Sequence, residues 1–292
     1  MDQRETRDRV LVGVDGSEDG LRATRYGVGR AKRLDLDLWL VHALDDGVVA
    51  GGWGVIYDPG VLEQSGQVAV QQAVDLAVER GLPRQRVHTS VLVGHPAVVL
   101  EELSHQAETM ILGRRSATGL ERMFVGSTST SLAATAGCPL VVISSASTPE
   151  PTGSQRRVSV AIGTGRTEKA LRWGCQEAVS RQSVLDVIHV IPPQASTALA
   201  LVSPPSQAEL VWEGRVKEEL ERRVKPLRQE FPDLAIETHP IVGSPIDQLI
   251  AQTQISDLLI LSVRSRPITG IALGGPVRGV LAHAASPVAL IR

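Results

Sequence analysis

The sequence predicts an α/β protein made of two tandem doubly wound domains, each with a mainly parallel five-stranded sheet and helices on both faces, a Rossmann-like arrangement. Two observations support this fold class. Short apolar runs rich in β-branched residues alternate with longer amphipathic stretches, a pattern typical of strands buried on both faces of a parallel sheet. The same series of runs also occurs twice along the 292 residues, which indicates a duplicated domain.

The repeat is visible in five segments of the first half, which recur in the same order and at a nearly constant interval in the second half. The matching pairs are 10–14 and 158–162, 38–43 and 185–190, 93–96 and 242–245, 109–113 and 258–262, and 138–143 and 286–291. Most of these segments read as short buried strands. Because the order is kept throughout, we expect each half to fold as one domain.

The amphipathic stretch 61–80 is predicted to be one of the covering helices, and 209–230 is its partner in the second half. Gly81 and Pro83 follow the stretch and predict the end of that helix. Its apolar positions at helical spacing are Val70, Ala73, Val74 and Ala77. The halves are joined by small, polar and proline-bearing residues, which predict a linker. We therefore expect domains at 1–145 and 157–292 and a linker at 146–156.

The composition restricts the cellular compartment and the classes of partner that we expect. Hydrophobic residues make up 42% of the chain and aromatic residues 3%, so the cores must be built from aliphatic side chains. With a net charge of −2 and no long basic run, neither nucleic acid nor an anionic membrane surface is expected as a partner. There is no uninterrupted apolar run of about 18 residues, and the N-terminus lacks a secretory signal core. Cys138 and Cys175 form no C-x-x-C pair and suit a reducing cytoplasm.

One stretch after the apolar run 109–112 has residue types that are typical of a binding site. It begins with Gly113, Arg114, Arg115 and Ser116, continues for nine residues, and ends with Gly126, Ser127 and Thr128. This pattern predicts a strand, a loop and the first turn of a helix. Glycines allow backbone N–H groups to approach an anion, and the positive end of the helix dipole points at the same place. The stretch therefore predicts a phosphate site.

The spacing resembles the nucleotide loop of the universal stress protein family, G-x2-G-x9-G-(S/T), with Ser116 in place of the second glycine. Together with Asp15 after the first strand, the resemblance covers nearly the whole chain and points to the tandem form of that family. It implies that Asp15 lies near adenine and ribose, that the backbone of Ala43 meets adenine, and that the loop holds the phosphates. The implied nucleotide-binding residues are Gly13, Asp15, Ala43, Gly113, Arg114, Arg115, Ser116, Gly126, Ser127 and Thr128.

The second copy lacks much of this pattern. Ser262 and Ser265 stand where the first turn would have glycines, and Pro276 follows Gly275 in place of a hydroxyl residue. Proline suits the first turn of a helix but has no N–H to donate to a phosphate. Asp15 has no counterpart either. We expect the second domain to keep the fold and to have lost or weakened the nucleotide site.

Each site residue also has a purely structural explanation. Asp15 and Ser127 are both suitable helix N-caps, the glycines suit turns, and Arg114 and Arg115 could be solvated loop residues. His42 and His189 are repeated at strand ends without metal-binding partners, which favours structural histidines over a metal site. No P-loop and no G-x-S-x-G motif occurs, so no catalytic residue is expected.

The resemblance implies a cytoplasmic, ATP-binding regulator of the stress response, with or without Mg²⁺, and not an enzyme. It also implies a homodimer, or an intramolecular pseudo-dimer, formed through the last strand of each domain at 140–143 and 288–291. Two alternatives stay open. One is an interaction scaffold of the same fold that binds no nucleotide, and the other is a weak ATP hydrolase.

Overall fold

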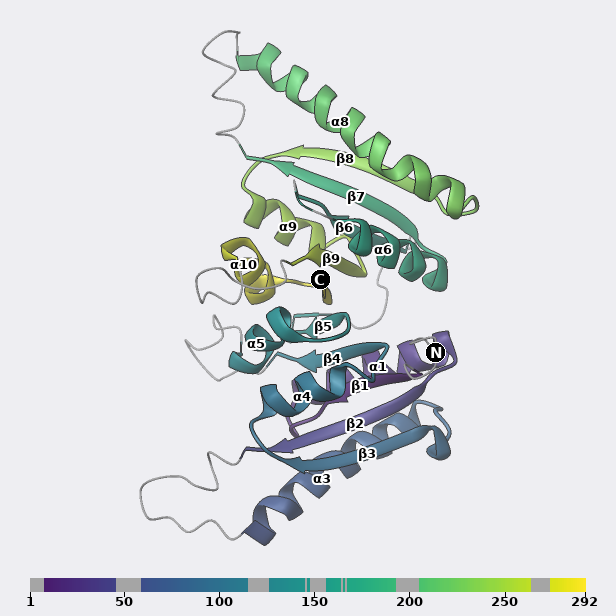
Figure 1. The fold of residues 1–292 in the computed structure, drawn as a ribbon, viewed down its shortest axis with the longest axis vertical. Helices are drawn as coiled ribbons and strands as arrows, with labels where there is room; N and C mark the ends of the chain where they lie inside the picture. Colours follow the sequence, from purple (N-terminus) through teal and green to yellow (C-terminus); the bar gives the residue numbers. More distant parts are fainter. Residues whose placement is uncertain are drawn as a thin grey trace. The chain divides into compact units, whose positions relative to one another are not determined.

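The structure is a computed structural model and describes residues 8–45, 59–114, 126–144, 146–147, 156–163, 165, 167–192, 205–263 and 274–292. The chain divides into two compact units (Figure 1), the first made of the described residues up to 147 and the second of those from 156. Most of the predicted linker lies outside the described residues, so its boundaries stay predictions. No helix in the described part of the chain has the length and apolar character that crossing a membrane requires.

The first unit contains one five-stranded parallel sheet, which confirms the predicted fold class. Its strands are β1 (Arg9–Gly13), β2 (Asp37–Leu44), β3 (Val87–Val93), β4 (Thr109–Gly113) and β5 (Leu140–Ile143), in the order β3-β2-β1-β4-β5. The last residue of β1, Gly13, is paired with Val41 on one side and Leu112 on the other. The chain therefore runs outward from β1 in both directions, and the strand order reverses at this point. Ligand sites of open α/β sheets lie at the carboxyl ends of strands beside such a reversal.

Within the described residues of this unit, four helices and a short 3-10 turn connect the strands. They are α1 (Glu18–Leu34), α3 (Pro59–Glu79), the turn η1 (Arg84–Arg86), α4 (Pro96–Ser104) and α5 (Ser127–Thr135). α1 packs against α3 on one face of the sheet, and α4 packs against α5 on the other. The predicted helix 61–80 corresponds to α3. Gly81, which follows it, has a φ of 80°, a conformation that favours glycine.

Helix α1 shows how local sequence sets the boundaries of an element. Ser17 is its N-cap and accepts a hydrogen bond from the backbone N–H of Gly20 at 3.1 Å. Acidic residues occupy the first turn and basic residues the last, as the helix dipole favours. In the middle of the helix, a Cβ on Gly27 would lie 2.6 Å from a methyl group of Val12. Glycine there lets α1 sit directly on the centre of the sheet.

The second unit repeats the plan, which confirms the duplication. Its strands are β6 (Arg157–Ala161), β7 (Val184–Ile191), β8 (Ile236–Val242), β9 (Leu258–Ser262) and β10 (Val288–Ile291), in the order β10-β9-β6-β7-β8. Its helices are α6 (Glu168–Arg181), α8 (Pro205–Glu230), α9 (Pro245–Thr253) and α10 (Gly275–His283). Gly174 of α6 meets Val160 as Gly27 of α1 meets Val12.

The two units bury different charged residues on the first helix of each unit, α1 in the first and α6 in the second. In the first unit, Arg30 is 1% exposed and makes two hydrogen bonds to Glu108, at 3.0 and 2.8 Å. In the second unit, the residue three positions after the packing glycine is Glu177, which is 2% exposed and pairs with Arg181 on the same helix. A buried charge must be paired to be tolerated, and each unit satisfies this requirement with a different pair.

We predict that Arg30→Met will lower the free energy of unfolding by about 3 kcal/mol, because it leaves the Glu108 carboxylate without its buried partner. Adding Glu108→Leu should restore most of the loss, since both charges are then gone. Urea denaturation followed by circular dichroism measures both effects. The control is Arg25→Ala, whose partner Glu18 is 59% exposed, and it should cost about 1 kcal/mol or less. Equal losses from Arg30→Met and Arg25→Ala would contradict this account.

Candidate functional site

A pocket of about 350 Å³ lies at the carboxyl ends of β1, β2 and β4 in the first unit. It is bounded by the loop after β1, the end of β2, the start of α4 and the start of α5. Seven residues that the sequence predicted for the nucleotide site line it: Gly13, Asp15, Ala43, Gly113, Gly126, Ser127 and Thr128. Residues that are more than a hundred positions apart in the chain are thus brought into one cavity.

Asp15 is fixed at the edge of this pocket. Its Oδ1 accepts hydrogen bonds from the backbone N–H of Ser17 at 3.1 Å and from the Ser17 hydroxyl at 2.5 Å. Ser17 is in turn the N-cap of α1, so the explanation of Asp15 as the N-cap is wrong. Asp15 instead orients the cap and presents a half-buried carboxylate to the pocket.

The start of α5 forms one end of the pocket. The N-cap is Gly126, with φ −55° and ψ 145°, and it makes no side-chain capping hydrogen bond. Ser127 is therefore the first helical residue, and the explanation of Ser127 as the N-cap is wrong. The first N–H groups of a helix have no partner within the helix. At α5 they lie at the pocket together with the hydroxyl-bearing residues Ser127 and Thr128, an arrangement that suits an anion.

The two glycines of the loop have different reasons for being glycine. A Cβ on Gly113 would lie 2.3 Å from the backbone oxygen of Asp19, so the packing of α1 against β4 already requires glycine there. A Cβ on Gly126 would meet nothing closer than the Ser129 hydroxyl at 4.0 Å. The part of the fold that the structure describes therefore has room for a side chain at Gly126, which lines the pocket.

Arg114 lies elsewhere than expected. It is not among the residues that line the pocket, and it is only 6% exposed, so it is not a solvated loop residue either. Burial lowers the pKa of its guanidinium, and the nearby Asp19 carboxylate opposes this shift. The backbone N–H of Arg114 donates to the carbonyl of Ile143, which anchors the residue to the end of β5. Direct contact of Arg114 with a phosphate is thus not supported. Arg115 and Ser116 lie outside the described residues.

Five further polar residues line the pocket and were not predicted to belong to it: His42, Asp45, Ser65, His95 and Ser129. Asp45 directly follows β2, and His95 follows β3, so the rule that ligands bind at strand ends could have identified them. Ser65 lies on α3, and nothing in the sequence marks it. Nδ1 of His42 is 2.8 Å from the backbone oxygen of Val14, as expected of a histidine with a structural role.

In the second unit, the loop after β6 is bonded to a side chain of α8. Arg223 of α8 donates to the Thr167 hydroxyl at 3.1 Å and approaches the backbone oxygens of Gly163 and Gly165 at 3.5 Å. Helix α10 has Gly274 as its N-cap and Pro276 in its first turn, so one N–H that could face an anion is missing. Ser265 lies outside the described residues. The expectation that this unit has lost or weakened its nucleotide site stays a prediction.

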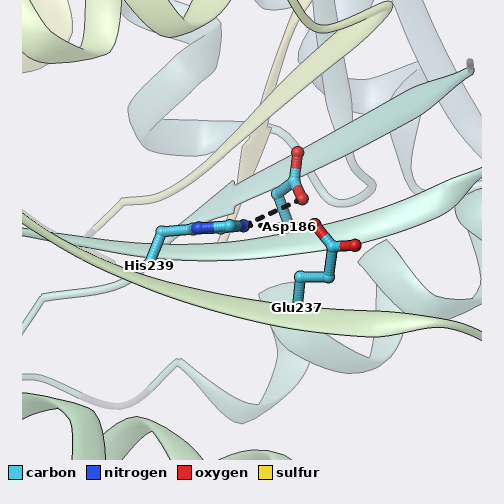
Figure 2. A group of neighbouring side chains, drawn as sticks. All are labelled: Asp186, Glu237 and His239. Atoms are coloured by element: carbon cyan, nitrogen blue, oxygen red, sulfur yellow. Dashed lines mark hydrogen bonds and ion pairs between the residues drawn. The ribbon is translucent and has the colours of Figure 1, made fainter.

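A second cluster of potential ligand atoms lies on the sheet of the second unit. Asp186 projects from β7, and Glu237 and His239 project from β8 (Figure 2), with their ligand atoms within 4.8 Å of one another. His239 Nε2 is 3.2 Å from Asp186 and 3.5 Å from Glu237. However, the guanidinium of Arg157 is already 2.7 Å from Asp186 and 3.1 Å from Glu237. Because the Arg157 guanidinium already pairs with both carboxylates, the cluster supports an ion-pair network and not a metal site.

We predict that Glu237 stabilises the fold in a pH-dependent way. The hydrogen bond from Arg157 holds the pKa of Glu237 below its ordinary value of 4.5. A lowered pKa stabilises the folded state above the ordinary value and loses this effect as the pH falls through the lowered value. The wild-type protein should therefore unfold at higher urea concentration than Glu237→Gln at pH 7, and the gap should close below pH 4.5. A gap that is independent of pH would contradict this explanation.

We also predict that Cys175 is unreactive in the folded protein. Its side chain is fully buried, and burial raises the pKa of the thiol to about 12, so almost no thiolate is present at pH 8. Iodoacetamide should leave Cys175 unmodified in the native protein and modify it after unfolding in guanidinium, as mapped by peptide mass spectrometry. Rapid modification of native Cys175 would show that this part of the core opens readily.

Comparisons with known proteins agree with this fold. A sequence model of the universal stress protein family matches residues 6–144 and again 155–292. A universal stress protein of Mycobacterium tuberculosis is 28% identical over 294 residues, which cover 97% of this chain and 96% of that protein.

Among solved structures, a universal stress protein from Archaeoglobus fulgidus superposes with a TM-score of 0.70 at 15% identity and covers 97% of this chain and 96% of its own. A shorter universal stress protein from Archaeoglobus fulgidus, in complex with dAMP, is 23% identical and covers 47% of this chain and 98% of its own, with a TM-score of 0.35. Because the family model matches both halves of the sequence, the chain belongs to the universal stress protein family, in its tandem form.

Proposed function

We propose that the first unit binds an adenine nucleotide, with ATP as the expected ligand, and that the protein acts as a regulator whose state depends on nucleotide occupancy. One observation carries the proposal: seven predicted residues from separate parts of the chain line a single pocket at the point where the strand order reverses. At Gly126, packing against the described residues gives no reason for glycine, because they leave room for a side chain.

The pocket is polarised in a way that suits a nucleotide. At one end, the start of α5 offers backbone N–H groups and the hydroxyls of Ser127 and Thr128 to phosphate oxygens. At the other end, the carboxylate of Asp15 can accept hydrogen bonds from ribose hydroxyls, and the backbone of Ala43 can pair with a base edge. Leu44 and Leu100 add apolar surface for a planar ring.

We propose one nucleotide site per chain. The second unit lacks the carboxylate of Asp15, carries Pro276 in the first turn of α10, and holds its own strand-end loop with Arg223. In the first unit, the pocket carboxylates of Asp15 and Asp45 have the chemistry to approach a Mg²⁺ ion that is bound to phosphate oxygens. Mg²⁺ would thus enter together with ATP and not as a resident metal.

The proposed biological role follows from the family to which the chain belongs. We propose a cytoplasmic protein that contributes to a stress response without catalysing a reaction, and that forms a homodimer or an intramolecular pseudo-dimer through β5 and β10. A scaffold of the same fold without nucleotide is the main alternative. Two observations favour this alternative. The packing of α1 already explains why residue 113 is glycine, so that glycine need not serve a ligand, and Arg114 is buried away from the pocket.

We predict that Gly126→Leu will weaken ATP binding by about tenfold or more, because the new side chain occupies the phosphate end of the pocket. Its effect on folding should be small, since the position has no close neighbour. Isothermal titration calorimetry with ATP measures the affinity. The control is Gly29→Leu on α1, which also has no neighbour within 4 Å and does not line the pocket. It should bind ATP as the wild-type protein does.

Mass spectrometry of small molecules released from the denatured protein complements the titration. About one adenine nucleotide per chain supports the proposal, whereas two would show that the second unit also binds. If the wild-type protein carries no nucleotide and binds no ATP, the proposal is wrong and the scaffold alternative remains. Formation of ADP above enzyme-free controls would instead identify a hydrolase.

A further inference from the structure

We infer that His42 is a positioning residue that sets the nucleoside end of the pocket by holding the Val14–Asp15 peptide against the end of β2. The inference rests on the proposed nucleotide site. It assigns to a strand-end histidine a role in ligand binding that acts through the residues beside it, and not through contact with the phosphate end.

The hydrogen bond has a defined direction. His42 Nδ1 lies 2.8 Å from the backbone oxygen of Val14, and a carbonyl oxygen can only accept, so Nδ1 carries the hydrogen. The backbone N–H of Val14 donates to the oxygen of Val41 at 2.9 Å. Both polar groups of Val14 are therefore bonded to consecutive residues of β2, although Val14 lies beyond the last residue of β1.

This bond links the two residues that are expected to meet the nucleoside. Asp15 follows Val14 directly, and its carboxylate is fixed by Ser17. Ala43 follows His42 directly on β2. One side chain thus sets the spacing between a carboxylate for ribose and a backbone edge for the base, and a fixed spacing is what preorganises a binding site.

The imidazole is itself held in place by α3. Gly66 of that helix is buried, and a Cβ there would lie 2.9 Å from Cδ2 of His42. The absence of a side chain at Gly66 gives the ring the room it occupies between the helix and the strand. The orientation of Nδ1 toward Val14 is therefore a consequence of packing from two elements.

The second unit provides an internal comparison. His189 Nδ1 lies 2.7 Å from the oxygen of Ile162, and the N–H of Ile162 donates to Ile188 at 2.9 Å. The residue that follows Ile162 is Gly163, which carries no carboxylate. The same bond therefore serves only the fold in the second unit, whereas in the first unit it also positions Asp15.

The test compares the affinities of adenosine and AMP for His42→Asn and His42→Gln by calorimetry. Asparagine keeps an N–H donor two bonds from Cβ, as in Nδ1 of histidine, whereas glutamine moves the donor one methylene further. We expect His42→Asn to bind both ligands within about twofold of the wild-type protein and His42→Gln to weaken both by about tenfold. The ratio of the two affinities should stay unchanged, because the phosphate end is not altered.

His189→Gln is the matched control. It should lower stability about as much as His42→Gln does and leave both affinities unchanged. If His42→Gln binds adenosine and AMP as tightly as His42→Asn, or if it weakens AMP alone, the inference is wrong while the proposed function stands. If the wild-type protein binds neither ligand nor ATP, the proposed function itself fails.

Discussion

The structure of each unit depends on the reversal of strand order at its central strand. Because β2 and β4 both pair with β1, the chain leaves the sheet in opposite directions at the same edge, and a cavity opens between the loops. Gly27 and Gly113 make possible the close contact of α1 with the sheet. The start of α5 then brings its unpaired N–H groups to the cavity. The position of these N–H groups at the cavity is thus a consequence of topology.

Duplication has preserved this framework while changing the chemistry on it. In the first unit, Arg9 lies over the ring of Trp39 at 5.7 Å, and the indole N–H donates to Ser90 at 3.0 Å. In the second unit, the matching strands carry Arg157, which pairs with the buried carboxylate of Asp186. An arginine at the start of the central strand is kept in both units, whereas its partner is an aromatic ring in one and an ion-pair network in the other. The same backbone tolerates both arrangements, because Arg9 stacks on an aromatic ring and Arg157 pairs with carboxylates.

The sequence was sufficient for the fold and for much of the pocket, because apolar runs, helix stops and strand-end glycines are local signals. Seven predicted residues reach the cavity, since strand ends on one edge must lie together. Arg114 could not be placed, because its direction depends on Asp19 and on the end of β5, which are remote in the chain. Ser65 was missed because a serine on a helix has no distinguishing pattern. The cap positions at Ser17 and Gly126 needed backbone angles, which composition does not specify.

The pairs buried beneath α1 and α6 have a consequence for how a chain with two similar halves assembles. Repeated domains in one polypeptide can exchange equivalent elements while they fold. Glu177 of α6 stands where α1 carries Arg30, three residues after the packing glycine in each case. If α6 docked on the first sheet, Arg181 would accompany Glu177, but Glu108 would lose the cation that Arg30 supplies and would gain a second carboxylate nearby. The difference in charge at this one helical position therefore disfavours docking of α6 on the first sheet.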